Sequence, residues 1–289
     1  MKKLAVINDL SGFGKCSLTA AIPVISVMGV QPCPLPTAVL SAQTGYPSYY
    51  LEDFTDKMEA IRLEWKKLGA EFDGIYTGFV ASEEQIEHIF QFIGTFRKEG
   101  TFLLVDPVMG DDGNKYDMFT DGLLLKMKKL VYMADVITPN LTEFCLLTDV
   151  DYEEVCCLSG EMLTQRLRQM ADRILPNGPG TIVVTGIHFT DKDGEKIGNL
   201  VLTESASQMI AFPYIGQSFS GTGDLFASVL AGGMTRGDHI EDLCRLAGQF
   251  TWKAMEESVR NGAENTGGTE FERYLGMLLP GGNGFLKEK

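Results

Sequence analysis

Short runs of β-branched and apolar residues alternate with longer amphipathic stretches along most of this chain, and this alternation limits the folds open to it. Strands are expected at residues 4–8, 74–77, 102–106, 134–138 and 181–185, and helices at residues 15–28, 83–98, 123–130, 161–174, 240–259 and 270–278. Strands and helices that take turns in this way form a mostly parallel sheet covered by helices on both faces. Residues 199–202 and 208–212 follow a turn signal at 191–194 and predict an antiparallel edge. The expected fold is therefore a three-layer α/β/α protein of the α/β class.

The chain has no repeat, low-complexity tract or linker-like break, so residues 1–289 are expected to form a single domain. Its 44% hydrophobic content is ample for a buried core. Asp and Glu outnumber Lys and Arg by 39 to 25, and the net charge of -14 disfavours binding to DNA, RNA and anionic membranes. Small molecules are the partners expected instead.

Two further features predict a cytoplasmic protein. No apolar run approaches the roughly 20 residues of a membrane-spanning helix, and the first one ends at Asn8-Asp9, too early for the core of a signal peptide. The 6 cysteines show no paired CxxC spacing, which favours reduced thiols.

The tetrapeptide Gly221-Thr222-Gly223-Asp224 stands directly before the apolar run 225–231, where a helix is expected to begin. Two glycines allow close approach of the backbone to a ligand, and the unpaired N–H groups of a first helical turn attract an anion such as phosphate. Asp224 would be repelled by that phosphate unless it takes a proton from a hydroxyl that attacks it. The alternative is an ordinary helix start, where the helix dipole favours an acidic residue. The tetrapeptide alone leaves both interpretations open.

Acidic and amide side chains also follow the third and fourth expected strands. Asp106 ends the third strand and Asp111 comes after it, and Asn140 and Glu143 come after the fourth. Because ligands of open α/β sheets bind at the carboxyl ends of the strands, these residues could meet there as oxygen ligands, direct or through water, for magnesium that carries a nucleotide. Taken singly, Asn140 could instead cap a helix, and the region of Asp111 could form an ordinary turn.

The first strand leads into a glycine-rich turn at residues 8–17. Gly14-Lys15 resembles part of a P-loop, but position 16 is Cys rather than Ser or Thr, and position 9 is Asp rather than Gly. A GxGxxG dinucleotide pattern fails as well, because position 17 is Ser. What remains is a flexible strand-to-helix turn, suited to a small ligand or to a tight connection.

In combination, these motifs resemble the ribokinase-like superfamily and, within it, the pyridoxal (vitamin B6) kinases, over residues 4–253. The motifs that carry the resemblance are Thr37-Ala38-Val39-Leu40-Ser41-Ala42-Gln43-Thr44-Gly45-Tyr46, Thr77-Gly78-Phe79, Asp106-Pro107-Val108-Met109-Gly110-Asp111, Ile137-Thr138-Pro139-Asn140 with Glu143, and Ser220-Gly221-Thr222-Gly223-Asp224-Leu225-Phe226. The resemblance implies a ribokinase-like fold and ATP-dependent phosphorylation of the 5'-hydroxymethyl group of pyridoxal, pyridoxine or pyridoxamine. It also implies magnesium, often potassium, and pairing into homodimers.

Carried over residue by residue, the resemblance gives each motif a role. Asp224 would be the catalytic base, and Gly221, Thr222 and Gly223 would hold the transferring phosphate. Asp106, Asp111 and Glu143 would organise magnesium. The nucleotide would be lined by Thr138, Asn140, Thr185, Gly186 and Thr222. Thr44 would contact the substrate ring, and the segment around Tyr46, within a lid at residues 41–50, would lie over it.

Two positions depart from the pyridoxal kinase pattern. Asp9 stands where these kinases usually have a serine that contacts the ring, and Phe79 replaces a tyrosine and so removes one hydrogen-bonding group. The Asp9 carboxylate could pair with a protonated ring nitrogen or an amino substituent. Alternatively, Asp9 could only cap the turn that follows it.

Two other functions remain open. Hydroxymethylpyrimidine kinases share the superfamily and have a comparable first loop, which Asp9-Leu10-Ser11-Gly12 resembles, whereas the segment 37–46 favours the B6 kinases. The second alternative is a ligand-binding homologue that has lost catalysis. Such a protein is expected to have a damaged anion site or acid cluster, and both motifs are intact here.

Overall fold

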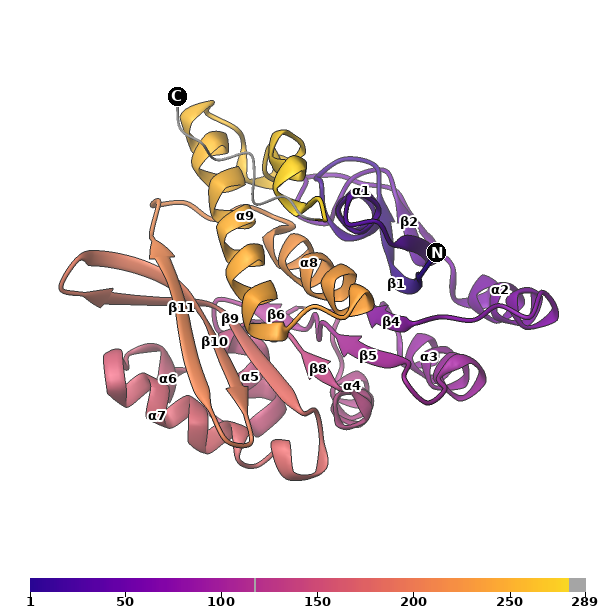
Figure 1. Cartoon of the computed structure of the whole chain (residues 1–289), viewed down its shortest axis with the longest axis horizontal. Helices are drawn as coiled ribbons and strands as arrows, with labels where there is room; N and C mark the ends of the chain where they lie inside the picture. Colours follow the sequence, from indigo (N-terminus) through magenta and orange to yellow (C-terminus); the bar gives the residue numbers. More distant parts are fainter. Residues whose placement is uncertain (117, 281–289) are drawn as a thin grey trace.

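A nine-stranded sheet forms the centre of the molecule (Figure 1). The computed structural model describes residues 1–116 and 118–280, and in them the strands run in the order β11-β10-β9-β8-β5-β4-β1-β2-β3. These strands are β1 (Lys3–Ser11), β2 (Gln31–Leu40), β3 (Leu51–Asp53), β4 (Gly74–Thr77), β5 (Phe102–Val105), β8 (Val136–Ile137), β9 (Thr181–Asp191), β10 (Gly194–Thr203) and β11 (Ser207–Pro213). A separate hairpin consists of β6 (Gly110–Asp111) and β7 (Asn114–Lys115).

The central strands run parallel, and both edges of the sheet are antiparallel. β1 pairs in parallel with β2 and β4, and the parallel series continues through β5, β8 and β9. β10 is antiparallel to both β9 and β11. The prediction of a mostly parallel sheet with an antiparallel edge is therefore confirmed. The structure adds a second antiparallel edge, where β3 pairs with the end of β2.

Helices cover both faces of this sheet (Figure 1). They are α1 (Ser17–Val27), α2 (Thr55–Lys67), α3 (Glu83–Phe96), α4 (Asp121–Met133), α5 (Leu141–Thr148), α6 (Glu153–Cys156), α7 (Gly160–Ala171), α8 (Thr222–Arg236) and α9 (Ile240–Arg260), with 3₁₀ segments η1 (Leu175–Asn177), η2 (Asn265–Gly267) and η3 (Phe271–Leu278). The last expected helix, at 270–278, is thus a 3₁₀ segment rather than an α-helix. No helix within the described residues is long and apolar enough to cross a membrane.

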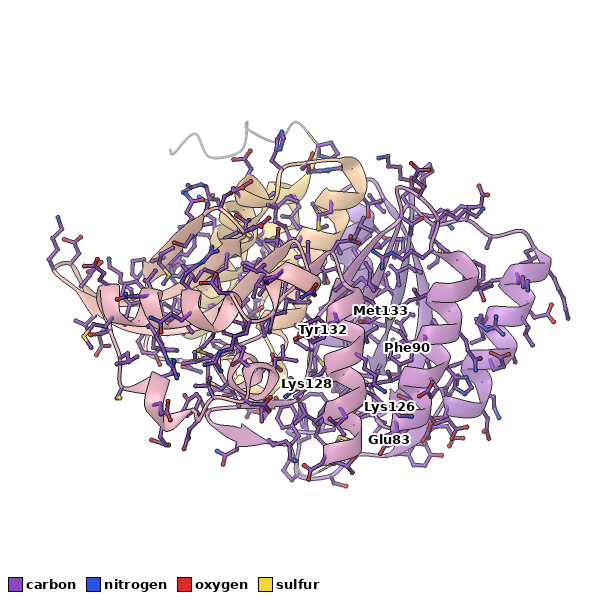
Figure 2. The ribbon with its side chains drawn as sticks, turned by 90° about the horizontal axis from the view of Figure 1, so that it is seen from below. Glu83, Phe90, Lys126, Lys128, Tyr132 and Met133 are labelled. Carbon is purple, nitrogen blue, oxygen red and sulfur yellow. The ribbon has the colours of Figure 1, made fainter. Side chains whose placement is uncertain are left out.

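Alternate side chains of the central strands enter two different cores. Ala5 and Ile7 of β1 pack with α2, α3, α4, α5 and α7, whereas Leu4 and Val6 pack with α1, α8, α9 and η3. On the side opposite α8, helices α3 and α4 lie next to each other (Figure 2), and Lys126 Nζ lies 3.8 Å from Glu83 Oε2. The period of two along each strand fixes which residues can face α8.

Polar residues at the carboxyl ends of three strands continue the series that faces α8. Asn8 lies two positions after Val6, Asp106 two after Leu104, and Thr138 two after Val136. Their side chains therefore gather at the end of the sheet next to the start of α8.

Strand β2 was not expected from the sequence, because it contains Pro32, Pro34 and Pro36. The N–H of Gln31 donates to the Lys2 carbonyl at 3.0 Å, so the odd-numbered N–H groups of β2 face β1 and the prolines face away. β3 pairs only with residues 38–40 of β2. Within the described residues the proline-bearing part is thus an edge, where a missing donor is tolerated.

Candidate active site

A cavity of about 810 Å³ opens at the carboxyl ends of the parallel strands. Nearly all residues expected in the site line it: Asp9, Thr44, Phe79, Asp106, Asp111, Thr138, Asn140, Glu143, Thr185, Gly186, Gly221, Thr222, Gly223 and Asp224. Tyr46 does not line this cavity. The volume is within the usual range for small-molecule sites.

The start of α8 forms an anion site built on Gly221. This residue has φ +81°, and a Cβ placed on it would collide with the Lys15 carbonyl oxygen, so only glycine fits without strain. The Thr222 hydroxyl donates to the Phe219 carbonyl at 3.1 Å. The N–H groups of the first helical turn are left to face the cavity, and the helix dipole adds partial positive charge there. This geometry suits a phosphate group.

Asp224 is the third residue of α8 and is half-buried. Burial raises the pKa of its carboxyl to about 6, and the nearby Asp9 carboxylate raises it further. The Ser17 backbone N–H and the Asn8 side chain, whose Nδ2 lies 3.1 Å from Asp224 Oδ1, act in the opposite direction. A carboxyl with a pKa near neutral at an anion site can accept a proton from a substrate hydroxyl.

Asp106 and Glu143 form a buried acid cluster beside the anion site. Burial raises the pKa of Asp106 to about 7, with a further contribution from Asp224, while the Thr138 hydroxyl, 2.9 Å from Asp106 Oδ1, lowers it. Burial also raises the pKa of Glu143 well above its usual range, and the charges of Asp106 and Asp111 add to this. The cluster therefore concentrates negative charge that a cation would relieve.

The acid cluster fits a magnesium ion that is shared with water and with nucleotide phosphate oxygens. Its donors are hard carboxylate oxygens, which suit this ion. Among the described residues, however, no three His, Cys, Asp or Glu side chains are grouped closely enough to hold a metal by themselves. Magnesium commonly keeps several waters and binds through one or two carboxylates plus substrate phosphates.

Glu143 also has a structural role. Its Oε2 accepts from the Asn140 N–H at 2.8 Å, and Asn140 Oδ1 accepts from the Glu143 N–H at 2.9 Å, which is a capping box at the start of α5. Glu143 Oε1 accepts from the Met109 N–H at 3.1 Å. The alternative that Asn140 caps a helix is thus confirmed, and Asn140 lines the cavity as well.

The expected turn after Asp111 is the tip of the β6–β7 hairpin. Asp112 and Gly113 have φ values of 47° and 79°, and the Gly113 N–H donates to the Thr142 hydroxyl at 2.8 Å, which holds the hairpin against α5. Just before α5 begins, the Pro139 carbonyl accepts from the Thr185 N–H at 2.9 Å. These contacts shape the cavity wall where the nucleotide is expected.

Asp9 and Phe79, the two positions that depart from the pyridoxal kinase pattern, also line the cavity. Asp9 is 6% exposed, and its Oδ2 accepts from the Ser11 hydroxyl at 2.7 Å. Burial raises the pKa of Asp9, while the Ser17 and Ser11 hydroxyls lower it. The Phe79 carbonyl accepts from the Thr37 hydroxyl at 3.0 Å. Asp9 therefore lines the cavity and also accepts hydrogen bonds from the hydroxyls of the turn that follows it.

Residues 41–50 form a loop whose base is closed by Ser41 and Tyr50. The Ser41 N–H donates to the Tyr50 carbonyl at 3.0 Å, and the Tyr50 N–H donates to the Ser41 hydroxyl at 2.8 Å. Gln43, for which no individual role was predicted, connects the loop to Ser220, directly before the anion site. Its Nε2 lies 3.3 Å from Ser220 Oγ and 3.1 Å from the Thr266 carbonyl oxygen.

Comparison with known proteins agrees with this geometry. Residues 14–269 match the model of the phosphomethylpyrimidine kinase family. A pyridoxal kinase of Rubrobacter xylanophilus is 26% identical over 265 residues, which cover 89% of this chain and 88% of that protein.

Solved structures of similar proteins have the same fold along nearly the whole chain. A Bacteroides thetaiotaomicron protein, provisionally assigned as a phosphomethylpyrimidine kinase and crystallised with pyridoxal, is 37% identical with a TM-score of 0.87 and covers 96% of this chain and 95% of its own. The pyridoxal kinase of Lactobacillus plantarum is 27% identical with a TM-score of 0.83 and covers 96% of each chain. The expectation of a ribokinase-like fold is confirmed. The chain therefore belongs to the phosphomethylpyrimidine kinase family, whose relatives of the same fold include pyridoxal kinases.

Proposed function

We propose that this protein transfers the γ-phosphoryl group of ATP to the 5'-hydroxymethyl group of pyridoxal, pyridoxine or pyridoxamine. The observation that carries the proposal is Asp224, a carboxylate with a raised pKa held at the anion site of α8. Relatives named as pyridoxal kinases and the pyridoxal complex of the Bacteroides thetaiotaomicron protein support the choice of substrate. The intact anion site and acid cluster disfavour a non-catalytic homologue.

In the proposed reaction, Asp224 accepts the proton of the substrate hydroxyl as its oxygen attacks the γ-phosphorus. The Gly221, Thr222 and Gly223 N–H groups stabilise the negative charge on the transferring phosphoryl oxygens, because they are aligned before the reaction begins. ADP leaves along the wall formed by Thr138, Asn140, Thr185 and Gly186. Asp106, Asp111 and Glu143 would hold magnesium, which lowers the charge of the nucleotide phosphates.

Phosphorylation of hydroxymethylpyrimidine is the second candidate function. The family model that matches the chain carries the phosphomethylpyrimidine kinase name, and Asp9, a charged acceptor at the cavity wall, suits an amino-substituted pyrimidine as well as a protonated pyridine. Both substrates present a hydroxymethyl group on a flat ring, so the same catalytic groups serve either one.

A panel assay separates the two candidates. ADP release is measured with pyridoxal, pyridoxine, pyridoxamine, hydroxymethylpyrimidine and a sugar, and the phosphorylated product is identified by mass. The proposal expects the highest kcat/KM for one of the three vitamers. A kcat/KM for hydroxymethylpyrimidine above those of all three vitamers would favour the second candidate function. If the protein phosphorylates none of the ring substrates, both candidates are contradicted.

We also propose a cytoplasmic homodimer of single-domain subunits, in which residues 41–50 form a lid, and a requirement for magnesium with stimulation by potassium. The free state of all six cysteines supports a reducing compartment. Sedimentation tests the dimer, and the rate in potassium compared with sodium tests the monovalent ion.

A further inference from the structure

Asn8 is a fully buried amide in contact with the proposed catalytic base. It lies near the end of β1, just before the irregularity in the pairing of β1 with β2. Its Nδ2 donates to Asp224 Oδ1 at 3.1 Å, across 216 positions of the sequence. Its Oδ1 accepts from the Asp9 N–H at 3.0 Å and from the Phe79 N–H at 2.8 Å.

The two backbone donors determine which way the amide points. An amide oxygen accepts and an amide nitrogen donates, so two N–H groups on one side of Asn8 place its NH₂ group toward Asp224. Gly78 makes room for this arrangement, because a Cβ at that position would collide with Asn8 Nδ2. Each hydrogen-bonding group on the Asn8 side chain has a partner, and those partners lie on β1, after β4 and on α8.

We propose that Asn8 is a positioning residue for phosphoryl transfer, which ties the Asp224 carboxylate to the backbone of Asp9 and Phe79. This inference rests on the proposed function, since Asp9 and Phe79 lie where the substrate ring is proposed to bind. One side chain thereby sets the spacing between the base and the ring wall. Small errors in such spacing slow a reaction strongly, because the attacking oxygen and the base must stay aligned.

Asn8 also has an electrostatic effect on the base. Burial raises the pKa of Asp224 to about 6, whereas the hydrogen bond from the Asn8 N–H group favours the charged form of Asp224 and so lowers this pKa. The other ionisable groups near Asp224 are Asp9 on β1, Asp106 after β5, Tyr76 on β4, Cys16 before α1 and Tyr116 after β7. Asn8→Ala leaves all of them in place and adds no ionisable group, so its effect on the titration of Asp224 can be read directly.

The variant Asn8→Asp keeps the acceptor oxygen of the side chain and removes its donor. One carboxylate oxygen still accepts from the Asp9 and Phe79 N–H groups, while the other replaces the donor that faces Asp224. We expect kcat to fall roughly 10- to 100-fold with ATP affinity unchanged. The acid limb of the kcat profile should move up by roughly one to two pH units, because the charged form of Asp224 loses its donor and gains a like charge. Asn8→Ala removes the donor without adding charge and should move the limb in the same direction, by less.

Gln85→Glu is the matched control. Gln85 is also a fully buried amide that accepts from a backbone N–H, that of Ala81 at 2.8 Å, but it does not line the cavity. The same amide-to-acid change there should lower the melting temperature and leave the acid limb where it is. If Asn8→Asp behaves like Gln85→Glu, with stability lowered and the limb unmoved, Asn8 has only a structural role and the inference is overturned.

A second measurement uses no substrate. The double variant Asn8→Asp/Asp224→Asn places a donor opposite an acceptor again, in reversed order, and should melt at a higher temperature than Asn8→Asp alone. The carboxyl carbon of Asp224, followed by NMR, should titrate at higher pH in Asn8→Ala than in the wild type. If the double variant melts no higher than Asn8→Asp and the titration of Asp224 is the same in Asn8→Ala as in the wild type, the proposed role of the Asn8 contact is contradicted, whatever the substrate. If instead the wild type does not phosphorylate a vitamer, only the proposed function is contradicted.

Discussion

Glu143 caps helix α5 and also belongs to the acid cluster. The substitution Glu143→Gln tests which of these two roles matters for the reaction. Glu143→Gln keeps the shape of the side chain and one acceptor oxygen for the cap, but it loses one of the two backbone hydrogen bonds of Glu143 and removes the charge that the resemblance assigns to magnesium. We expect the magnesium concentration for half-maximal rate to rise roughly tenfold, with a smaller change in the KM of the vitamer. The reason is that loss of one carboxylate from the acid cluster mainly weakens metal binding. A titration of rate against magnesium checks this. A lower melting temperature with an unchanged magnesium dependence would leave Glu143 with the cap alone.

Residues whose position in the cavity follows from a strand end could be predicted from the sequence. Asp106 and Glu143 stand in motifs that mark the carboxyl ends of β5 and β8, and a parallel sheet brings such ends together. Asn8 and Gln43 were missed, because their contacts join segments far apart in the sequence. The Asn8 bond to Asp224 spans 216 positions, and no local pattern identifies which buried amide makes it.

The loop at residues 41–50 is tethered in this structure by Gln43, which contacts Ser220 directly before the anion site. We predict that a vitamer with a nucleotide analogue slows hydrogen exchange in this loop, because closure excludes water that would otherwise accept the phosphoryl group. Gln43→Ala should weaken that protection and raise the KM of the vitamer. Exchange equally fast with and without both ligands would argue against a lid.

At the level of elements, regular periodicity was enough to predict most of the parallel sheet and its helices, whereas the elements missed include β2 and α5. β2 is rich in proline, which normally excludes a strand, and its position at the edge became clear only from the pairing with β1. α5 spans eight residues, Leu141–Thr148, and most of its side chains are buried, so it shows no amphipathic pattern. In both cases tertiary packing overrides the local signal.

Across the whole molecule, buried and half-buried carboxyls with raised pKa values make stability depend on pH. Burial raises the pKa of Asp106 to about 7 and that of Asp224 to about 6. The folded state therefore holds more protons than the unfolded state between about pH 4 and these values, and the free energy of unfolding of the ligand-free protein should fall as pH rises through this window. Exposed acids whose pKa is lowered by ion pairs, such as Asp121, change the free energy of unfolding only at pH values below that window.

Urea denaturation at pH 5 and at pH 7.5 tests this dependence. The wild type should be less stable at the higher pH, and Asp106→Asn should show a smaller difference, because the amide has no charge to bury. An Asp106→Asn protein with the same pH dependence as the wild type would contradict the account of the acid cluster.

The central claim is that Asp224 is the base of a phosphoryl transfer, and the turnover of Asp224→Asn tests it most directly. The amide keeps the size of the side chain and the start of α8, so the protein should fold and bind nucleotide as the wild type does. Turnover of the vitamer should fall roughly 10²- to 10⁴-fold, because the substrate hydroxyl loses its proton acceptor. Normal nucleotide binding with more than about half of the wild-type turnover would exclude Asp224 from the mechanism.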